Sequence, residues 1–530
     1  MDGRAMAHAA PRRRPSPWVV LGVLCVGQFM TLLDTTIVNI ALPDLITQLD
    51  ASLDEALWVY SAYLLSFSTL LITAGRLGDL YGPRRVYLIG LTVFVVASAI
   101  CGLSQTPVQL IMARVIQGIG AALLSPQILP IITMVFPPSK WGAAFGLTGA
   151  LSGLAVLAGP TLGGLVVTAL DWRWVFFLNL PIGAVALPLV VRVVHDYRPG
   201  IRHRLRLGSV ALLTGGLAGL TFALLEGERY GWPVWIRTVM VAGVVAIIAF
   251  AATQWRGRDH EPLLPPDLFT SRNFTVMTGV AAAMGFAMFG AFLPLTIYLQ
   301  SVLGMSPIEA GLTIAVMPLV AALVANSAGR LSDRFGGKYL LMTGLATFAT
   351  GLSAVALSAG VDSGALALAP GLGVAGLGMG LIFAPLYSVA MASVSPRLSG
   401  VASGVISTSQ ELGGLLAGAA LGAVMQSVLA TALTSQATTA AEQLPEAARP
   451  DFIESFRTFA AGAIKYSNAG PPANAGPGSQ LATQVFDAAF VQAMRPTMLL
   501  AAAALFAATL GCIKIKDRRK ELTRTMDRAT

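Results

Sequence analysis

The chain of 530 residues is 55% hydrophobic and only 12% charged, and its mean hydropathy is +0.72. Soluble domains carry roughly 25% charged residues, so this composition excludes an ordinary soluble protein and indicates an integral membrane protein. Its long, continuous apolar runs also exclude a transmembrane β-barrel, whose strands are about 10 residues long and alternate in polarity.

Fourteen apolar segments follow one another along the chain, and each is long enough for a spanning helix, which needs about 20 mostly apolar residues. The sequence therefore predicts an all-α polytopic membrane protein with fourteen transmembrane helices. Because this number is even, both termini lie on one side of the membrane. The predicted spans lie near 17–41, 55–75, 84–104, 107–133, 141–168, 174–194, 207–226, 234–254, 274–300, 307–329, 338–358, 365–391, 400–429 and 491–513.

Positive charge is distributed unevenly among the segments that connect these spans. Lys and Arg number 35 against 26 Asp and Glu, and most of the bases fall on the side of the two termini. Because basic loops stay in the cytoplasm, both termini are predicted to be cytoplasmic. The same rule explains the net charge of +9 without a nucleic-acid partner. The three cysteines form no CxxC pair, so neither a disulfide framework nor a metal site is predicted.

The basic segment 75–85, GRLGDLYGPRR, recurs once as GRLSDRFGGK at 329–338, an offset of 254 positions. Each copy is interpreted as a loop after the second span of a six-span unit. A single recurrence at half the chain length indicates a duplicated unit, since repeat arrays have periods of about 20–50 residues. The spans are therefore predicted to be arranged as six, two and six, with 207–226 and 234–254 as an extra central pair.

This arrangement divides the chain into five parts. Segment 430–490 is rich in Ala, Gln, Thr, Pro and Gly, and is predicted to be a mobile loop with at most a short amphipathic helix at 451–465. The predicted parts are a cytoplasmic tail at 1–16, a six-helix bundle at 17–200, two extra spans with basic flanking loops at 201–272, a second six-helix bundle with the long extracytoplasmic loop at 273–513, and a basic cytoplasmic tail at 514–530.

Three ionisable side chains, Asp34, Arg114 and Glu411, fall inside predicted spans. Charge is costly in lipid, so each is expected to face the protein interior and to mark a proton-coupling or cation-binding site. Two alternatives remain open. Asp34 could belong to a structural polar cluster with the two threonines that follow it and Asn39, and Arg114 could extend to the membrane surface about two turns away. An acid at Glu411 would let the second bundle contribute to the same site.

The repeated basic segment has features of a conformational latch. Its glycines permit a tight turn, its arginines hold that turn at the cytoplasmic surface, and Asp79 can accept bonds from those arginines or occupy a helix N-terminus. The alternative is an anchor that only fixes topology. The second copy lacks the base at Arg85, so Asp79 is predicted to matter more than Asp333. The predicted latch residues are Gly75, Arg76, Gly78, Asp79, Gly82, Arg84, Arg85 and Asp333.

The fifth predicted span contains glycines four residues apart, which allow two helices to approach closely, and Pro160, which can kink the span. This glycine motif comprises Gly149, Gly153, Gly159, Pro160 and Gly163. Aromatic residues of several spans could line an adaptable apolar cavity, and Tyr63 and Phe292 are named as candidate substrate contacts.

Four motifs in this order give the chain a resemblance to a known family. They are LDTTIVNIALPDL at 33–45, GRLGDLYGPRR at 75–85, RVIQGIGAALLSP at 114–126, and the glycine-rich span that leads to WRWVFFLNLPIG at 172–183. From about residue 18 to 513 the chain resembles the major facilitator superfamily, and its extra central pair resembles the fourteen-span drug:proton antiporter branch. The resemblance implies that Arg114 takes part in proton transfer and that the glycine motif belongs to exporters rather than importers.

By this resemblance the chain is expected to be a monomeric proton-coupled antiporter of the bacterial cytoplasmic membrane, exporting lipophilic, often cationic compounds by alternating access. The sequence contains no P-loop, catalytic carboxylate pair or nucleophile elbow, so an enzyme and an ATP-driven pump are disfavoured, and the proton gradient replaces any cofactor. Two alternatives are a dedicated exporter of one metabolite, antibiotic or lipid, and a membrane sensor that transports nothing.

Overall fold

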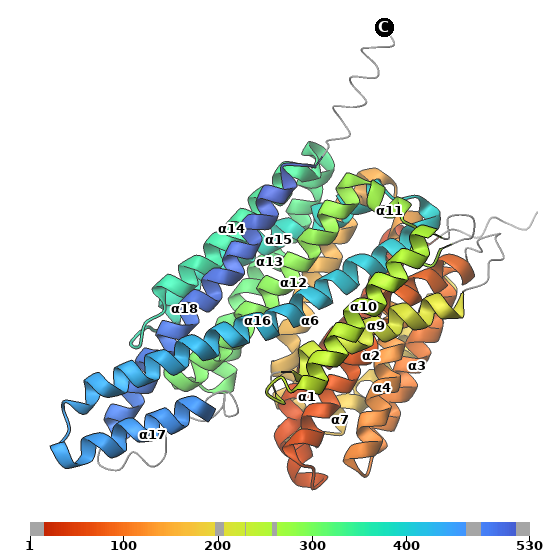
Figure 1. Ribbon diagram of the computed structural model, residues 1–530. Coiled ribbons are helices and arrows are strands. Elements are labelled where there is room, and N and C mark those ends of the chain that lie inside the picture. Colours follow the sequence, from red (N-terminus) through yellow and green to blue (C-terminus); the bar gives the residue numbers. More distant parts are fainter. Residues whose placement is uncertain (1–14, 197–205, 228, 257–261, 463–478, 516–530) are drawn as a thin grey trace, which may run out of the picture.

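The computed structural model describes residues 15–196, 206–227, 229–256, 262–462 and 479–515 (Figure 1). These residues form helices and contain no strand, which confirms the predicted all-α fold. Thirteen helical segments of the described chain are long and apolar enough to cross a membrane, and they coincide with thirteen of the predicted spans. The remaining predicted span, 141–168, coincides with α6 (Trp141–Ala169), a helix of 29 residues without a charged side chain.

The N-terminal half is built from the helices that precede residue 197. They are α1 (Pro17–Gln48), α2 (Leu53–Tyr81), α3 (Pro83–Leu103), α4 (Pro107–Leu124), which continues through the turn Ser125–Gln127 into α5 (Ile128–Val135), α6, α7 (Trp174–Phe177) and α8 (Asn179–Val193).

The C-terminal half follows a central pair of helices. The pair is α9 (Leu207–Glu226) and α10 (Val234–Arg256), and a short helix, α11 (Asp267–Thr270), leads on. The C-terminal half comprises α12 (Arg272–Ile297), which ends in a π-helical turn (Tyr298–Val302), α13 (Pro307–Phe335), α14 (Gly337–Ser358), α15 (Ala365–Ala392), α16 (Ser399–Ala441), α17 (Arg449–Gly462) and α18 (Ser479–Cys512).

The duplication extends over the whole length of α2 and α13. Both helices have 29 residues, and both their first and last positions differ by the same offset of 254 as the repeated motif. Each begins with a capping box, in which a serine side chain and a glutamate three residues later satisfy the free backbone N–H groups. Each ends at a glycine with positive φ, Gly82 at 96° and Gly336 at 89°. The two halves are therefore copies of one structural unit.

The repeated motif is helical rather than a loop, which corrects the prediction for 75–85. α2 continues through the motif to Tyr81, and only Gly82 forms the turn to α3. Gly75 serves helix packing instead, because a Cβ at this position would lie 2.1 Å from the carbonyl oxygen of Gly400 on α16. Of the three motif glycines, one is required by the turn and the others by close neighbours.

The two halves meet chiefly along two helix pairs, α2 with α16 and α6 with α13, and α6 also contacts α15. We call the end of the molecule that contains Asp79 and Asp333 the latch end, and the opposite end the α17 end. Figure 1 shows the halves converging at the latch end, at the top, and diverging toward the α17 end. In the second pair, a Cβ on Gly142 would lie 2.4 Å from the carbonyl oxygen of Gly329, so backbone meets backbone at the latch end in both pairs.

The segment predicted as a mobile loop, 430–490, is largely helical. α16 has 43 residues, or about 65 Å at 1.5 Å per residue, more than twice the apolar thickness of a bilayer. α17 lies where the short amphipathic helix was predicted, and its Phe452 and Phe456 rings pack 5.1 Å apart. The prediction of a loop was wrong because alanine, which dominates this segment, is the strongest helix former. Residues 463–478, and with them the PPANAGPGSQ run, lie outside the described residues.

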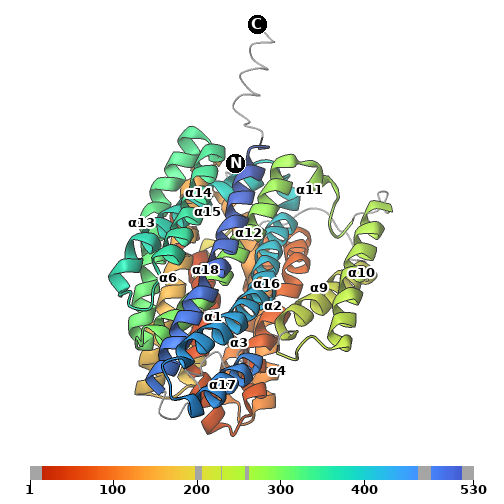
Figure 2. The same cartoon turned by 60° about the vertical axis from the view of Figure 1, so that its left-hand side comes forward.

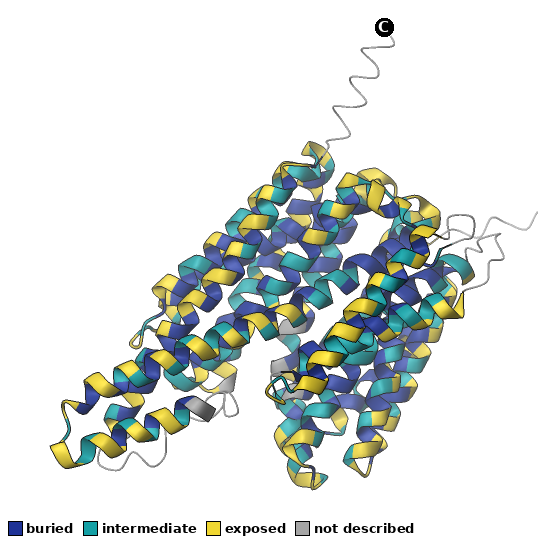
Figure 3. Cartoon of the chain, in the orientation of Figure 1, coloured by how far each residue is buried: buried dark blue, intermediate teal, exposed yellow. Residues whose placement is uncertain are grey.

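The central helices α9 and α10 form a hairpin that packs through small residues, since a Cβ on Gly243 would lie 2.8 Å from the carbonyl oxygen of Gly216. The hairpin lies against α2 and α16, on the opposite side of the molecule from α6 and α13 (Figure 2). Buried residues line the helix contacts and exposed residues the outer faces (Figure 3). Many of the exposed residues are large and apolar. Such wide apolar exposure is what a lipid-facing surface requires.

Candidate functional site

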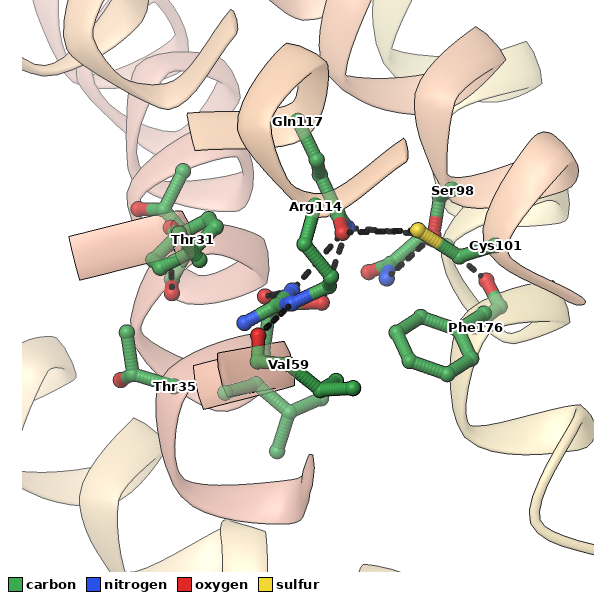
Figure 4. Close-up of polar contacts among 12 residues, drawn as sticks. Thr31, Thr35, Val59, Ser98, Cys101, Arg114, Gln117 and Phe176 are labelled. Atoms are coloured by element: carbon green, nitrogen blue, oxygen red, sulfur yellow. Dashed lines mark hydrogen bonds and ion pairs between the residues drawn. The ribbon is translucent and has the colours of Figure 1, made fainter. Parts of the chain in front are cut away.

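A buried ion pair joins two of the three predicted ionisable residues. The Arg114 guanidinium of α4 donates through Nη1 to Oδ2 of Asp34 on α1, and both side chains are 0% exposed. Both residues lie on helices of the N-terminal half, and Figure 4 shows Arg114 with its neighbours Val59 and Gln117. Two opposite charges removed from water need hydrogen bonds as well as each other, so the surrounding groups determine whether the pair is stable.

Gln117 supplies much of this support. Its side-chain oxygen accepts from Nη1 of Arg114 at 2.7 Å, and its Nε2 donates to Oδ1 of Asp34 at 2.9 Å. Nε of Arg114 donates to the carbonyl oxygen of Val59 on α2 at 3.0 Å, which fixes the plane of the guanidinium (Figure 4). Sequence reasoning missed Gln117, although its position three residues after Arg114 puts both side chains on one face of α4.

The network continues through α3 to α8. Ser98 accepts from Nε2 of Gln117 at 3.3 Å and from Nδ2 of Asn179 at 3.0 Å, and it donates to the carbonyl oxygen of Phe176 at 2.8 Å. The ion pair is thus held by residues from most helices of the N-terminal half. Ser98 and Asn179 were not predicted, since a lone Ser or Asn in an apolar span gives no signal of its own.

Tyr63, predicted to contact substrate, packs on the ion pair. Its ring centre lies 4.2 Å from the guanidinium carbon of Arg114, and its hydroxyl donates to the carbonyl oxygen of Thr31 at 3.4 Å. A cation above an aromatic face is stabilised by the ring quadrupole. Phe292, the other candidate contact, lies on α12 with its side chain 43% exposed, and no described interaction connects it with the ion pair.

The two alternatives for the ion-pair residues can now be compared with the structure. Arg114 does not extend to the membrane surface, because it is fully buried and bonded within the protein. Of the threonines in the alternative polar cluster, Thr35 donates to the carbonyl oxygen of Leu32 at 2.7 Å and Thr36 to that of Leu33 at 3.0 Å, both on their own helix. The side chain of Asn39 lies outside the described residues.

Asp79 joins the two halves at the latch end. Its carboxylate accepts from the backbone N–H of Gly400 at 2.7 Å and of Val401 at 2.9 Å, both in the first turn of α16. These N–H groups have no partner within the helix, and the positive end of the helix dipole favours an anion there. Of the two roles predicted for Asp79, the structure shows the contact with a helix N-terminus. That helix, α16, belongs to the other half.

Asp333 makes the corresponding contact in reverse. Its carboxylate, on α13 of the C-terminal half, accepts from the N–H of Gly142 at 2.8 Å and of Ala143 at 3.2 Å, at the start of α6. We call these two contacts, Asp79 with Gly400 and Val401 and Asp333 with Gly142 and Ala143, the two latches. Each latch connects one half to the other.

The other motif residues hold the latch helix in place within the N-terminal half. Arg84 donates to the carbonyl oxygen of Val191, and Arg85 forms an ion pair of 3.3 Å with Asp196 after α8. Arg76 is buried on α2. A Cβ on Gly78 would lie 1.9 Å from the side-chain oxygen of Gln127, so a larger residue here would displace that side chain.

The glycine motif of α6 contacts two different partners along its length. Toward the latch end, added Cβ atoms on Gly149 and Gly153 would lie 3.0 Å from Phe383 of α15 and 3.3 Å from Pro318 of α13, both in the other half. Toward the α17 end, Gly159 and Gly163 pack against α1 of the same half. The side chain of Pro160 lies outside the described residues. α6 therefore passes from the contact between the halves into its own half.

Glu411 lies on α16 and, unlike the fully buried Asp34 and Arg114, is only partly buried. It makes no hydrogen bond or ion pair with any residue that the structure describes, and it lies within electrostatic range of Tyr60 and Tyr63 of α2 and of Tyr387 of α15. Tyrosines of both halves therefore lie near it. A carboxylate without a counter-ion beside aromatic rings can accept a proton or attract a cation.

Comparison with known proteins places this arrangement in a family. The sequence profile of the Major Facilitator Superfamily matches residues 24–418. A probable actinorhodin transporter of Streptomyces coelicolor is 36% identical over 424 residues, which are 78% of this chain and 72% of that protein. The multidrug resistance protein Stp of Mycobacterium tuberculosis is 33% identical over 389 residues, 73% of this chain and 72% of that protein.

A solved structure of low sequence identity has the same fold. The human organic anion transporter MFSD10 superposes with a TM-score of 0.58 at 15% identity, covering 93% of this chain and 100% of that one. With its duplicated halves, its reciprocal latches and these relatives, the chain belongs to the Major Facilitator Superfamily.

Proposed function

We propose that this membrane transporter is a proton-coupled antiporter that exports lipophilic, often cationic compounds from the bacterial cytoplasm. Glu411 carries the proposal, because it is a carboxylate without a described counter-ion at the contact between the two halves. A site that binds either a proton or a cation, but not both, is what an exchange of the two requires. The names of related multidrug and antibiotic resistance proteins support export.

The distribution of bases supports an orientation. Arg84 and Arg85 lie at the latch end, and basic residues stay in the cytoplasm, so we infer that the latch end is cytoplasmic. The structure then corresponds to a carrier whose cytoplasmic end is closed by the two latches. Opening them and closing the α17 end would give the inward-facing form, as rocking of two repeats about a shared site allows.

The inferred cycle uses both carboxylates. A proton arriving from outside neutralises Glu411 or Asp34, which weakens the binding of a cationic substrate there and lets it leave. Neutral Asp34 would also release Arg114 to its other partners, the Val59 carbonyl and Gln117, so the N-terminal half can repack. Each elementary charge that moves inward gains about 2.3 kcal/mol per 100 mV, so no ATP is needed.

The test is the efflux of a cationic dye from vesicles with and without an imposed pH gradient. Wild type should respond to the gradient, and Glu411→Gln should abolish or narrow cation transport while the protein is still made and folded. Glu442→Gln, which changes a glutamate just after the end of the same helix, is the matched control. Dye efflux that ignores the gradient would refute antiport, and undiminished cation efflux by Glu411→Gln would remove this residue from the mechanism.

A dedicated exporter of one antibiotic or metabolite is the second candidate. It is favoured by the probable actinorhodin transporter, which is 36% identical to this chain. A transport panel that compares lipophilic cations with neutral aromatic compounds separates the two. Broad cation transport supports the first function, and transport confined to one neutral compound supports the second.

A further inference from the structure

The two contacts between the halves are equivalent in their backbone geometry but not in their surroundings. We call them the α2–α16 seam and the α6–α13 seam. Each holds one latch and one close approach of glycine backbones. The α9–α10 hairpin, which has no counterpart in the duplication, lies beside the α2–α16 seam only, and α6 and α13 lie on the far side (Figure 2).

α2 and α13 occupy equivalent places in the two halves, but only α2 lies beside the hairpin. A comparison of their exposed residues therefore indicates how much of α2 the hairpin covers. Leu312, Leu319 and Leu323 of α13 are 57%, 47% and 73% exposed. Between Glu55 and Leu80, by contrast, α2 has no exposed residue at all. The positions of α2 that correspond to those three leucines, at the offset of 254, are Trp58, Leu65 and Thr69.

Contacts with α9 contribute to this difference. α9 packs against both α2 and α16, so it bridges the seam between the halves. At the α17 end the rings of Trp58 and Phe222 stack with centres 6.0 Å apart and planes at 27°. Trp58 occupies the position equivalent to Leu312, so a residue that would otherwise face lipid is covered by the hairpin.

The polar attachment of the hairpin is one-sided. Arg229, in the connection between α9 and α10, donates through Nε to Oδ1 of Asp54 on α2 at 3.1 Å and through Nη1 to the buried Glu226 at 2.9 Å. Among the described residues, no hydrogen bond or ion pair joins the hairpin to the helices α12–α18, so its contact with α16 is one of packing. On that side, the N–H of Leu264, in the segment that leads to α11, donates to Oε1 of Gln254 on α10 at 3.3 Å. Packed apolar surfaces can slide in a way that ion-paired surfaces cannot.

We propose that the α9–α10 hairpin is a cover carried by the N-terminal half, under which α16 slides when the halves move. The α2–α16 seam then stays shielded from lipid throughout the cycle, and the uncovered α6–α13 seam is the side through which a lipophilic substrate passes between the bilayer and the protein. The substrate route rests on the proposed function, whereas the attachment and the shielding do not.

The attachment is tested by distances between pairs of nitroxide spin labels at exposed positions near the α17 end. The positions are Val234 in the hairpin, Val108 in the N-terminal half and Ile308 in the C-terminal half. The Val108–Ile308 distance reports the movement of the halves. The movement is triggered either by acid pH or by replacing both latch carboxylates, and the condition that changes the Val108–Ile308 distance is used. In that condition Val234–Val108 should stay constant while Val234–Ile308 changes. The reverse pattern would assign the hairpin to the C-terminal half and overturn the proposal.

The shielding is tested without any movement, in membranes, by the access of molecular oxygen to single labels at Leu65 and at its equivalent, Leu319. Oxygen concentrates in the bilayer interior, so Leu319 should relax several-fold faster than Leu65. Labels at Thr69 and Leu323 repeat the comparison if the first pair disturbs packing. Equal access within both pairs would refute the cover. Since neither measurement needs a substrate, a failure of drug transport and a failure of this proposal can be told apart.

Discussion

Replacing Asp79 with Asn should shift the equilibrium between latch-closed and latch-open forms. The carboxylate accepts two backbone N–H bonds from α16, at 2.7 and 2.9 Å, whereas an asparagine has one acceptor oxygen and turns its NH₂ toward the second N–H. A hydrogen bond to a charged group contributes about 1.5–3 kcal/mol, and a charge at a helix N-terminus about 0.3–1 kcal/mol. The change should therefore cost about 2–4 kcal/mol, or about 30-fold to 900-fold in population.

The same substitution at Asp333 should have the smaller effect, because its second bond, to Ala143, is 3.2 Å long. The assay is the distance distribution between spin labels at Ile89 and Tyr339, which are exposed at the latch end of the two halves. Asp79→Asn should increase the population of long distances, and Asp333→Asn should do so less.

Asp196→Asn is the matched control for the latch. It removes a carboxylate at the same end whose ion pair with Arg85 stays within the N-terminal half. An unchanged distance distribution in Asp79→Asn, or an equal change in Asp196→Asn, would refute the reasoning. A larger effect at Asp333 would assign the principal latch to the other half.

Two further predictions concern the ion pair and the glycine contacts. Arg114→Leu should lower the stability of the purified protein by about 3–5 kcal/mol in thermal unfolding, because it leaves Asp34 buried and unpaired. Arg114→Lys should not restore this stability, since an ammonium lacks the planar set of donors. Stability of Arg114→Leu equal to wild type would contradict the prediction. Gly400→Ala should impair transport, because its Cβ would lie 2.3 Å from the carbonyl oxygen of Gly75. The control is Gly418→Ala on the same helix, whose Cβ would have no atom within 4 Å and which should leave transport unchanged. Equal transport activities of the two variants would show that the backbone contact is dispensable.

Hydropathy was sufficient to predict the number and order of most helices, because a spanning helix must satisfy its backbone internally and be apolar along its length. It was insufficient at the helix ends. The prediction ended the second span at Gly75, but α2 continues to Tyr81, since polar residues at a membrane surface form helix as readily as loop. The glycines of the motif could not be sorted from sequence, because Gly75 avoids a steric clash with a distant helix whereas Gly82 adopts a positive φ.

Site residues could be predicted where a charged residue lies within an apolar span. Contacts between residues far apart in the sequence could not be predicted. Asp34 and Arg114 were identified from the cost of burying charge, which a single sequence displays. That they bind each other, across 80 positions, required the fold. The partner of Asp79 is the backbone N–H of Gly400, 321 positions away, so no side-chain type in the sequence indicates this contact.

The length of α16 has a mechanical consequence. The helix begins at the latch, passes Glu411 and continues beyond the span to Ala441 as one unbroken rod of about 65 Å. A tilt of about 10° at its latch end displaces the far tip by about 11 Å, so a small rearrangement at one face of the membrane becomes a large excursion at the other. By the reciprocity of linked equilibria, whatever restrains the tip also restrains the latch, with the same free energy.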